Sequence, residues 1–138
     1  MYLLDSCICI DFMRGEMPSV YDLLKESDPR LFGIPSIVEA ELRTGAERSS
    51  KPYMNRYITE SFLAPFKIVP FDSRCAIEYA KVRSFLEGNG MKIGANDMLI
   101  AATVLANGAV LATNNIKEFQ RIPGLTCESW YETSFRLR

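Results

Sequence analysis

The sequence predicts an α/β fold, a three-layer sandwich with a mainly parallel central sheet. Short apolar segments typical of buried strands alternate with longer segments whose apolar residues have helical spacing. No internal repeat or linker interrupts this alternation, and 48% of the 138 residues are hydrophobic, which suffices for one core. We therefore expect a single domain over residues 1–138, with its functional site outside the carboxyl ends of the strands.

The first half of the chain is expected to contain two strands and four helices. A strand at 2–4 leads into a helix, and a helix at 19–26, a strand at 31–34 and helices at 36–49 and 52–63 follow. Ser36 and Glu39 match the S-x-x-E capping box, in which each side chain caps the backbone N–H of the other residue. Pro52 is a favoured first helical residue.

The second half of the chain is expected to contain three strands and three helices. In order, these are a strand at 67–71, a helix from Asp72 or Ser73 to the Gly88-Asn89-Gly90 turn, a helix at 95–106, a strand at 110–113, a helix near 117–120 and a strand near Leu125. The first of these helices is predicted to bury the apolar residues Ile77, Ala80, Val82, Phe85 and Leu86. The nearly all-apolar helix at 95–106 is predicted to be central.

The absence of histidine is the most restrictive feature of the composition. It excludes Ser-His-Asp triads, Cys-His dyads, histidine-ligated metals and histidine acid–base catalysis. The four cysteines, Cys7, Cys9, Cys75 and Cys127, form no CxxC pair and no zinc-ligand spacing, so we expect buried, reduced thiols. Carboxylates that bind a hard cation through oxygen are the simplest catalytic groups left.

Charge and hydropathy restrict where the protein works and what it binds. No apolar run approaches the roughly 20 residues that span a bilayer, so we expect a cytoplasmic protein with no membrane partner. The net charge of −1 gives no overall attraction to nucleic acid. Arg43, Arg48, Lys51 and Arg56 form either a local basic patch or a solvated helix face.

Three acidic residues, Asp5, Glu41 and Asp97, lie in apolar surroundings that predict burial. Each also has a structural interpretation: Asp5 as a helix N-cap, Glu41 as a surface ion-pair partner, and Asp97 as a stabiliser of a helix dipole. Glu41 lies four residues after Ile37 on the inward face of its helix, whereas Glu39 lies about 200° away. Glu41 is therefore expected to be the interior member of the pair.

These three acids are expected to cluster, because an α/β topology brings strand ends and helix starts to one edge of the sheet. Clustered carboxylates repel one another at low effective dielectric, and protons or a divalent cation neutralise them. Mg²⁺ suits such a site because it binds few protein carboxylates, keeps several waters and leaves room for a substrate phosphate. The chemistry that follows is metal-activated attack of water on a phosphodiester.

Four segments together resemble the pattern of VapC-type toxins of the PIN-domain family. They are LLDS at 3–6, AELRTGAE at 40–47, IGAND at 93–97, and ATNN at 112–115 followed by EF at 118–119. Each segment alone is a weak signal, but their order and spacing are specific, and the likeness covers essentially the whole chain. The resemblance implies a metal-dependent endoribonuclease with Asp5, Glu41 and Asp97 as its acidic core, and Mg²⁺ or Mn²⁺ held by Asp5 and Asp97.

The chain departs from the family pattern at two positions. The usual fourth acid follows the threonine of the last strand, but two asparagines follow Thr113 here, so either Asn115 or Glu118, one turn on, is expected to fill that place. Cys7 stands where the family usually has asparagine, and a thiol cannot reproduce the hydrogen bonds of an amide, so we expect the first acid to be oriented less firmly. Ser6 is either a supporting site residue or a helix cap.

The resemblance also implies partners. They are an RNA substrate, a VapB-like antitoxin that blocks the acidic pocket with a basic side chain, DNA only through that antitoxin, and a second copy of the chain in a homodimer. Two alternatives stay open at this point: a non-catalytic module that acts within a repressor complex, and a metal-dependent phosphatase or phospho-receiver on a similar sheet.

Overall fold

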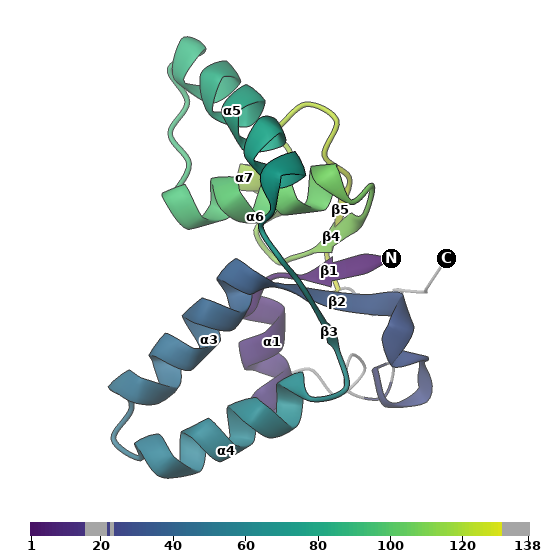
Figure 1. Cartoon of the computed structure of the whole chain (residues 1–138), viewed down its shortest axis with the longest axis vertical. Helices are drawn as coiled ribbons and strands as arrows, with labels where there is room; N and C mark the ends of the chain where they lie inside the picture. Colours follow the sequence, from purple (N-terminus) through teal and green to yellow (C-terminus); the bar gives the residue numbers. More distant parts are fainter. Residues whose placement is uncertain (16–21, 23, 131–138) are drawn as a thin grey trace.

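The computed structural model describes residues 1–15, 22 and 24–130. Within them, an all-parallel, five-stranded sheet forms the centre of the molecule (Figure 1). The strands are β1 (Tyr2–Leu4), β2 (Phe32–Pro35), β3 (Lys67–Val69), β4 (Val110–Ala112) and β5 (Cys127–Glu128). Their spatial order is β3-β2-β1-β4-β5, which places β1 in the middle. The predicted α/β class with a mainly parallel sheet is confirmed.

Helices cover both faces of this sheet. They are α1 (Ser6–Met13), α3 (Ser36–Arg48), α4 (Pro52–Leu63), α5 (Ser73–Gly88), α6 (Ala95–Ala106) and α7 (Ile116–Phe119), with a 3-10 turn at Pro29–Leu31. Figure 1 shows α1, α3 and α4 on one side and α5, α6 and α7 on the other. Connections between parallel strands are almost always right-handed. Because the chain crosses the sheet from β1 to β3 and then returns past β1 to β4 and β5, its helices lie on opposite faces.

The core lies on both faces of the short strands. Leu3, in the central strand, is fully buried, as expected for a sheet covered on both sides. Helix α6 is buried without interruption from Ile100 to Val104, so its predicted central position is confirmed. Trp130 packs edge-on against Tyr2 and Phe32, with ring centroids 5.6 and 5.7 Å apart. These contacts join the end of the described chain to β1 and β2.

Helix α3 starts differently from the prediction. Because β2 extends through Pro35, this residue is the N-cap of α3. Its side chain makes no capping hydrogen bond. The Ser36 hydroxyl accepts a hydrogen bond from the Phe71 N–H at 3.2 Å, and Glu39 forms an ion pair with Arg43 at 3.0 Å. The predicted capping box is therefore wrong, since both of its side chains have other partners.

Helix α5 buries a narrower face than predicted. Its buried residues are Cys75, Val82 and Leu86, which recur along one face and pack toward α6. The prediction that Ile77, Ala80 and Phe85 lie inside is wrong: all three are exposed, Ile77 at 59% and Phe85 at 38%. One neighbouring helix covers only one face of α5, so apolar residues on its flanks stay in contact with solvent.

The remaining bounds lie within two residues of those expected. The last strand, expected near Leu125, is formed by Cys127–Glu128. Of the helix expected at 19–26, residues 22 and 24–26 are helical, and the rest of that prediction lies outside the described residues. None of the helices in the described part of the chain is long and apolar enough to cross a membrane.

Gly33 in β2 provides a test of how tightly the sheet packs. A Cβ at this position would lie 2.8 Å from Leu3 Cδ2 and 2.9 Å from Val69 Cγ2. Gly33→Ala is therefore expected to lower the free energy of unfolding by about 1–3 kcal/mol, measured by urea denaturation. The control is Gly45→Ala in α3, where a Cβ meets nothing within 4 Å. It is expected to raise stability by up to about 1 kcal/mol. Unchanged stability of Gly33→Ala would contradict this packing.

Candidate active site

The candidate site lies where β1 and β4 run side by side. The chain leaves β1 toward β2 on one side and returns to β4 on the other, so the strand order reverses between β1 and β4. Ligand sites of open α/β sheets form at such switch points, outside the carboxyl ends of the strands. Asp5 directly follows β1, and Thr113 directly follows β4. The topology therefore brings these two residues together.

Asp5 is held from both sides of this junction. Its backbone N–H donates to Ala112 O at 2.9 Å. Its Oδ1 accepts from the Ser6 N–H at 2.8 Å, which makes Asp5 the N-cap of α1. Its Oδ2 accepts from the Thr113 hydroxyl at 2.7 Å, and the residue is only 5% exposed. The capping interpretation is thus confirmed, and it leaves Oδ2 facing the strand ends.

Cys7 also contacts Asp5. Its Sγ lies 3.5 Å from Asp5 Oδ2 and 3.9 Å from Thr113 Oγ1. Burial, and then the charge of Asp5, raise the pKa of this thiol to about 11, so it is a neutral donor at pH 7. The comparison with asparagine stays a prediction, but the thiol does contact the carboxylate that it was expected to orient poorly. All four cysteines are free, and Cys9 and Cys75 are buried, whereas Cys7 and Cys127 are half-buried.

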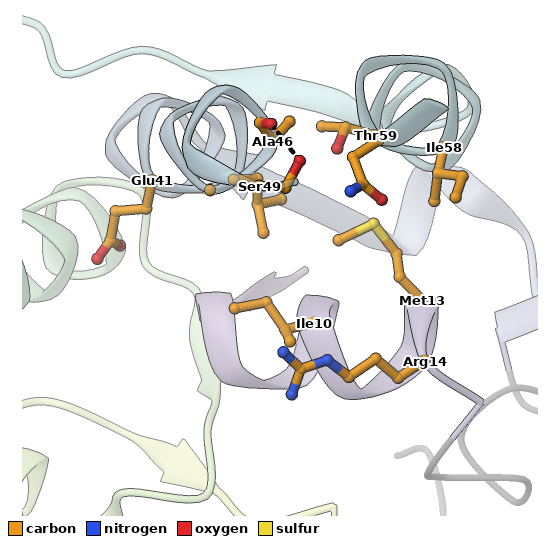
Figure 2. Close-up of a pocket in the computed structure, with 11 residues that line it drawn as sticks. Ile10, Met13, Arg14, Glu41, Ala46, Ser49, Ile58 and Thr59 are labelled. Carbon is orange, nitrogen blue, oxygen red and sulfur yellow. Dashed lines mark hydrogen bonds between the residues drawn. The ribbon is translucent and has the colours of Figure 1, made fainter. Parts of the chain in front are cut away.

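Glu41 reaches the site from α3. Burial, followed by the charge of Asp5, raises the pKa of its carboxyl, and the side chains of Asn96 and Ser6 oppose that rise. Its Oε1 is buried and has no hydrogen-bond partner among the described residues. Figure 2 shows the Glu41 carboxylate pointing away from Ile58 and Thr59 of α4. An unpartnered buried oxygen is costly unless a bound group satisfies it.

Asp97 lies in the first turn of α6. The helix dipole stabilises a negative charge there, yet the pKa of Asp97 is raised from 3.8 to about 7. Burial is the largest cause, and the charges of Glu118, Asp5 and Glu41 add to it, together with hydrogen bonding to Glu118. Desolvation and repulsion therefore outweigh the dipole, so the dipole does not explain this residue.

The two residues named for the fourth acidic position of the family pattern lie in α7 and at its N-cap. Asn115 is the N-cap, and its backbone N–H donates to Thr113 Oγ1 at 3.0 Å. The Asn115 side-chain amide donates to Glu118 Oε2. Glu118 in turn interacts with Asp97, whose pKa it raises. The structure thus links both residues named for this position, with the amide oriented toward Glu118.

These carboxyls form a spaced set. No three Asp, Glu, Cys or His side chains of the described residues lie close enough together to enclose a metal ion by themselves. Burial and, after it, repulsion from neighbouring carboxylates nevertheless raise the pKa values of Asp97 and Glu41, and Glu41 Oε1 lacks a partner. A cation that binds one or two carboxylates and keeps its waters, as Mg²⁺ does, fits this arrangement better than one that needs a complete protein cage.

Two depressions meet at Glu41 and Gly45. One, of about 410 Å³, lies between α1, α3 and α4 and is lined by Ile10, Met13 and Thr59 among others (Figure 2). The other, of about 580 Å³, lies between α3 and α6, and Asn96 and Arg48 line it. Asn96 lies in the IGAND segment, but it was given no role, and neither depression was predicted, because both depend on how separate helices pack. The only local signal is that Asn96 precedes Asp97.

Comparisons with known proteins identify the family. A family model for the PIN domain matches residues 2–125. Ribonuclease VapC2 of Rickettsia felis is 40% identical over 131 residues, which are 94% of this chain and 98% of the relative. The tRNA(fMet)-specific endonuclease VapC of Salmonella typhimurium is 32% identical over 129 residues, 94% of this chain and 97% of the relative.

Solved structures lead to the same family. The crystal structure of VapBC2 from Rickettsia felis bound to a DNA fragment from their promoter matches with a TM-score of 0.85 and 40% identity. The match covers 94% of this chain and 98% of that chain. Sequence and fold therefore agree over nearly the full length, and the chain belongs to the PIN-domain family as a member of its VapC ribonuclease group.

Proposed function

We propose that the protein is a Mg²⁺-dependent endoribonuclease toxin, which hydrolyses RNA phosphodiesters with a cluster of carboxylates and is inhibited by a cognate antitoxin. The observation that carries this proposal is Asp97, a half-buried carboxyl whose pKa is raised to about 7 by burial and by neighbouring carboxylates. Carboxyls with perturbed pKa values that converge in a cleft favour a catalytic site. Membership of the VapC group favours RNA as the substrate, and residues 1–138 would act as one nuclease domain.

Asp5 and Asp97 are the residues that would hold Mg²⁺, or Mn²⁺ in its place. When bound, such an ion lowers the pKa of a coordinated water and stabilises charge on a phosphate. Two features of the chain support this assignment. Each oxygen of Asp5 accepts a hydrogen bond, from Thr113 and from the start of α1, and a nearby positive charge would lower the raised pKa of Asp97 toward its usual value.

Glu41 would accept the proton of the attacking water. Its raised pKa makes it a better proton acceptor than an exposed glutamate, and it lines the depression between α3 and α6 in which a substrate would lie. Glu118 would supply the fourth acidic group, oriented by the Asn115 amide. Ser6 would support the site twice, because its N–H binds Asp5 and its side chain interacts with Glu41.

Solved relatives and the negative charge of the site together support the proposed partners. Solved relatives from Rickettsia felis, Salmonella typhimurium and Haemophilus influenzae are VapBC complexes, so we propose a VapB-like antitoxin as the inhibitor. A basic antitoxin side chain would be attracted by the carboxylates that raise the pKa of Asp97. DNA would be contacted only through that antitoxin. We also propose a homodimer and a cytoplasmic location.

The phospho-receiver alternative loses its candidate residue. A receiver needs an aspartate at the end of a middle strand, and Asp72, which follows the segment of β3, is the candidate that the sequence offers. Asp72 Oδ1 accepts from the Cys75 N–H at 3.1 Å and caps α5 at the edge of the sheet. Asp72 is thus engaged as a cap, away from the junction of β1 and β4. A non-catalytic repressor module gives no reason for carboxyls to be placed so that the pKa of Asp97 is raised.

The proposed activity is tested with purified protein and total cellular RNA. We expect endonucleolytic cleavage with Mg²⁺ or Mn²⁺ and none after EDTA treatment. Glu41→Gln should abolish cleavage. Glu39→Gln is the matched control, because Glu39 pairs with Arg43 on the outside of the same helix, and it should retain activity. Cleavage that survives exhaustive EDTA treatment would remove the metal mechanism, and equal loss in both variants would contradict the assignment of Glu41.

Asp97→Asn links the site to stability. Because the pKa of Asp97 is about 7 in the folded protein and 3.8 without the fold's influence, the folded state binds this proton more tightly. Without metal, stability should therefore fall as pH rises from about 4 to 7 and stay low above that range. Asp97→Asn should weaken this fall and, at pH 8 in EDTA, melt above wild type, with cleavage lost.

Thermal unfolding with EDTA and with millimolar Mg²⁺ or Mn²⁺ measures these changes. Metal should raise the melting temperature of wild type through binding to the folded state, and Asp97→Asn should lose most of that rise. If the variant melts below wild type in EDTA at pH 8, Asp97 is structural. An equal rise with metal in both proteins would show that Asp97 is not a ligand.

A further inference from the structure

We propose that Arg48 binds a backbone phosphate of the RNA substrate in the depression between α3 and α6, next to the acidic site. The inference rests on the proposed ribonuclease function and extends it to a residue outside the acidic cluster. The depression has a volume of about 580 Å³, and Glu41 and Arg48 both line it. A strand of RNA lying in it would thus contact a carboxylate at one place and a guanidinium at another.

Helical spacing aligns the residues of this surface. One stripe along α3 begins at Glu41 and continues three, four and seven positions later with Thr44, Gly45 and Arg48. Arg48 lies about 10 Å from Glu41 along the helix axis, at 1.5 Å per residue. Thr44 and Gly45, which lie between them on this stripe, have short side chains or none, and this leaves room for a phosphate backbone. Asn96 and Leu99 of α6 form the opposite wall.

Arg48 is the basic residue that lines this depression, and the fold leaves it available. Arg43 pairs with Glu39 and with Glu60, and Arg56 pairs with Glu47. Arg48 is exposed and makes no ion pair or side-chain hydrogen bond within residues 1–15, 22 and 24–130. Of the two open interpretations of the basic residues, this pairing favours a solvated helix face for Arg43 and Arg56 and a binding role for Arg48.

The overall charge of the protein gives a local cation a larger part in binding RNA. The net charge is −1, and the site itself is acidic, so long-range attraction does not bring RNA to it. A guanidinium offers a planar pair of donors that matches a phosphate. The Thr44 hydroxyl and the Asn96 amide line the same depression and can donate to further backbone oxygens. Arg48 would therefore be an RNA-positioning residue rather than a catalytic one.

The alternative is a structural role, because Arg48 is the last residue of α3 and a cation there interacts favourably with the helix dipole. The test separates the two by measuring RNA affinity and its salt dependence. The probe is a fluorescein-labelled oligouridylate of about 12 nucleotides, a length that single-strand-binding folds cover, bound in EDTA. The variants are Arg48→Ala and Arg48→Lys. Lys51→Ala is the matched control, an exposed cation that lies outside the depression.

Arg48→Ala is expected to weaken binding about tenfold and to reduce the slope of log Kd against log salt by about 0.7, the value for one phosphate contact on a single strand. In cleavage assays with Mg²⁺ it should raise KM more than it lowers kcat. Arg48→Lys should recover much of the affinity because it keeps the charge, and Lys51→Ala should behave as wild type.

An Arg48→Ala protein with the wild-type slope and KM would overturn the inference while leaving the proposed function intact. A fall in kcat alone would overturn it as well, because a backbone contact acts on binding. Equal effects of Arg48→Ala and Lys51→Ala would show that RNA is attracted only by nonspecific positive charge, and this would also overturn the inference. Failure of wild type to cleave any RNA would contradict the proposed function itself. If Arg48→Ala does not fold, Arg48→Gln and Arg48→Lys, checked by melting temperature, give the same comparison.

Discussion

The buried hydrogen bond from Thr113 to Asp5 joins the ends of β1 and β4, and it holds in place the carboxylate whose charge acts on Glu41 and Asp97. It fixes one oxygen of Asp5 at the switch point of the sheet, while the other oxygen starts α1. α3 and α6 then approach this point from opposite faces of the sheet and bring Glu41 and Asp97 to it. The site is thus assembled by topology, from residues that are distant in the sequence.

This assembly places carboxyls where water does not fully solvate them, and the consequence is seen in their pKa values. A helix N-terminus favours a charged aspartate by up to about 1 kcal/mol when exposed, but burial and three neighbouring carboxyls raise the pKa of Asp97 to about 7. The fold therefore keeps an unfavourable charge arrangement that a cation would relieve. The unpartnered Oε1 of Glu41 belongs to the same arrangement.

The fold class, nearly all of the elements and the approach of the three acids to one another were predictable, because strand runs, helix starts and apolar context are local in the sequence. Asp5, Glu41 and Asp97 each stand out against apolar neighbours. What failed depends on tertiary contacts. Ser36 has the spacing of a capping residue, but its hydroxyl accepts from a distant N–H. Ile77 has the polarity of a core residue, but only one face of its helix is covered.

The most direct test of the metal-dependent site is anomalous diffraction from crystals of the protein grown with Mn²⁺, which locates the ion independently of activity. We expect a strong peak outside the carboxyl ends of β1 and β4, next to the carboxylates of Asp5 and Asp97, which would hold the ion. A structure at saturating Mn²⁺ with no peak there, or with a peak bound by other residues, would contradict this expectation.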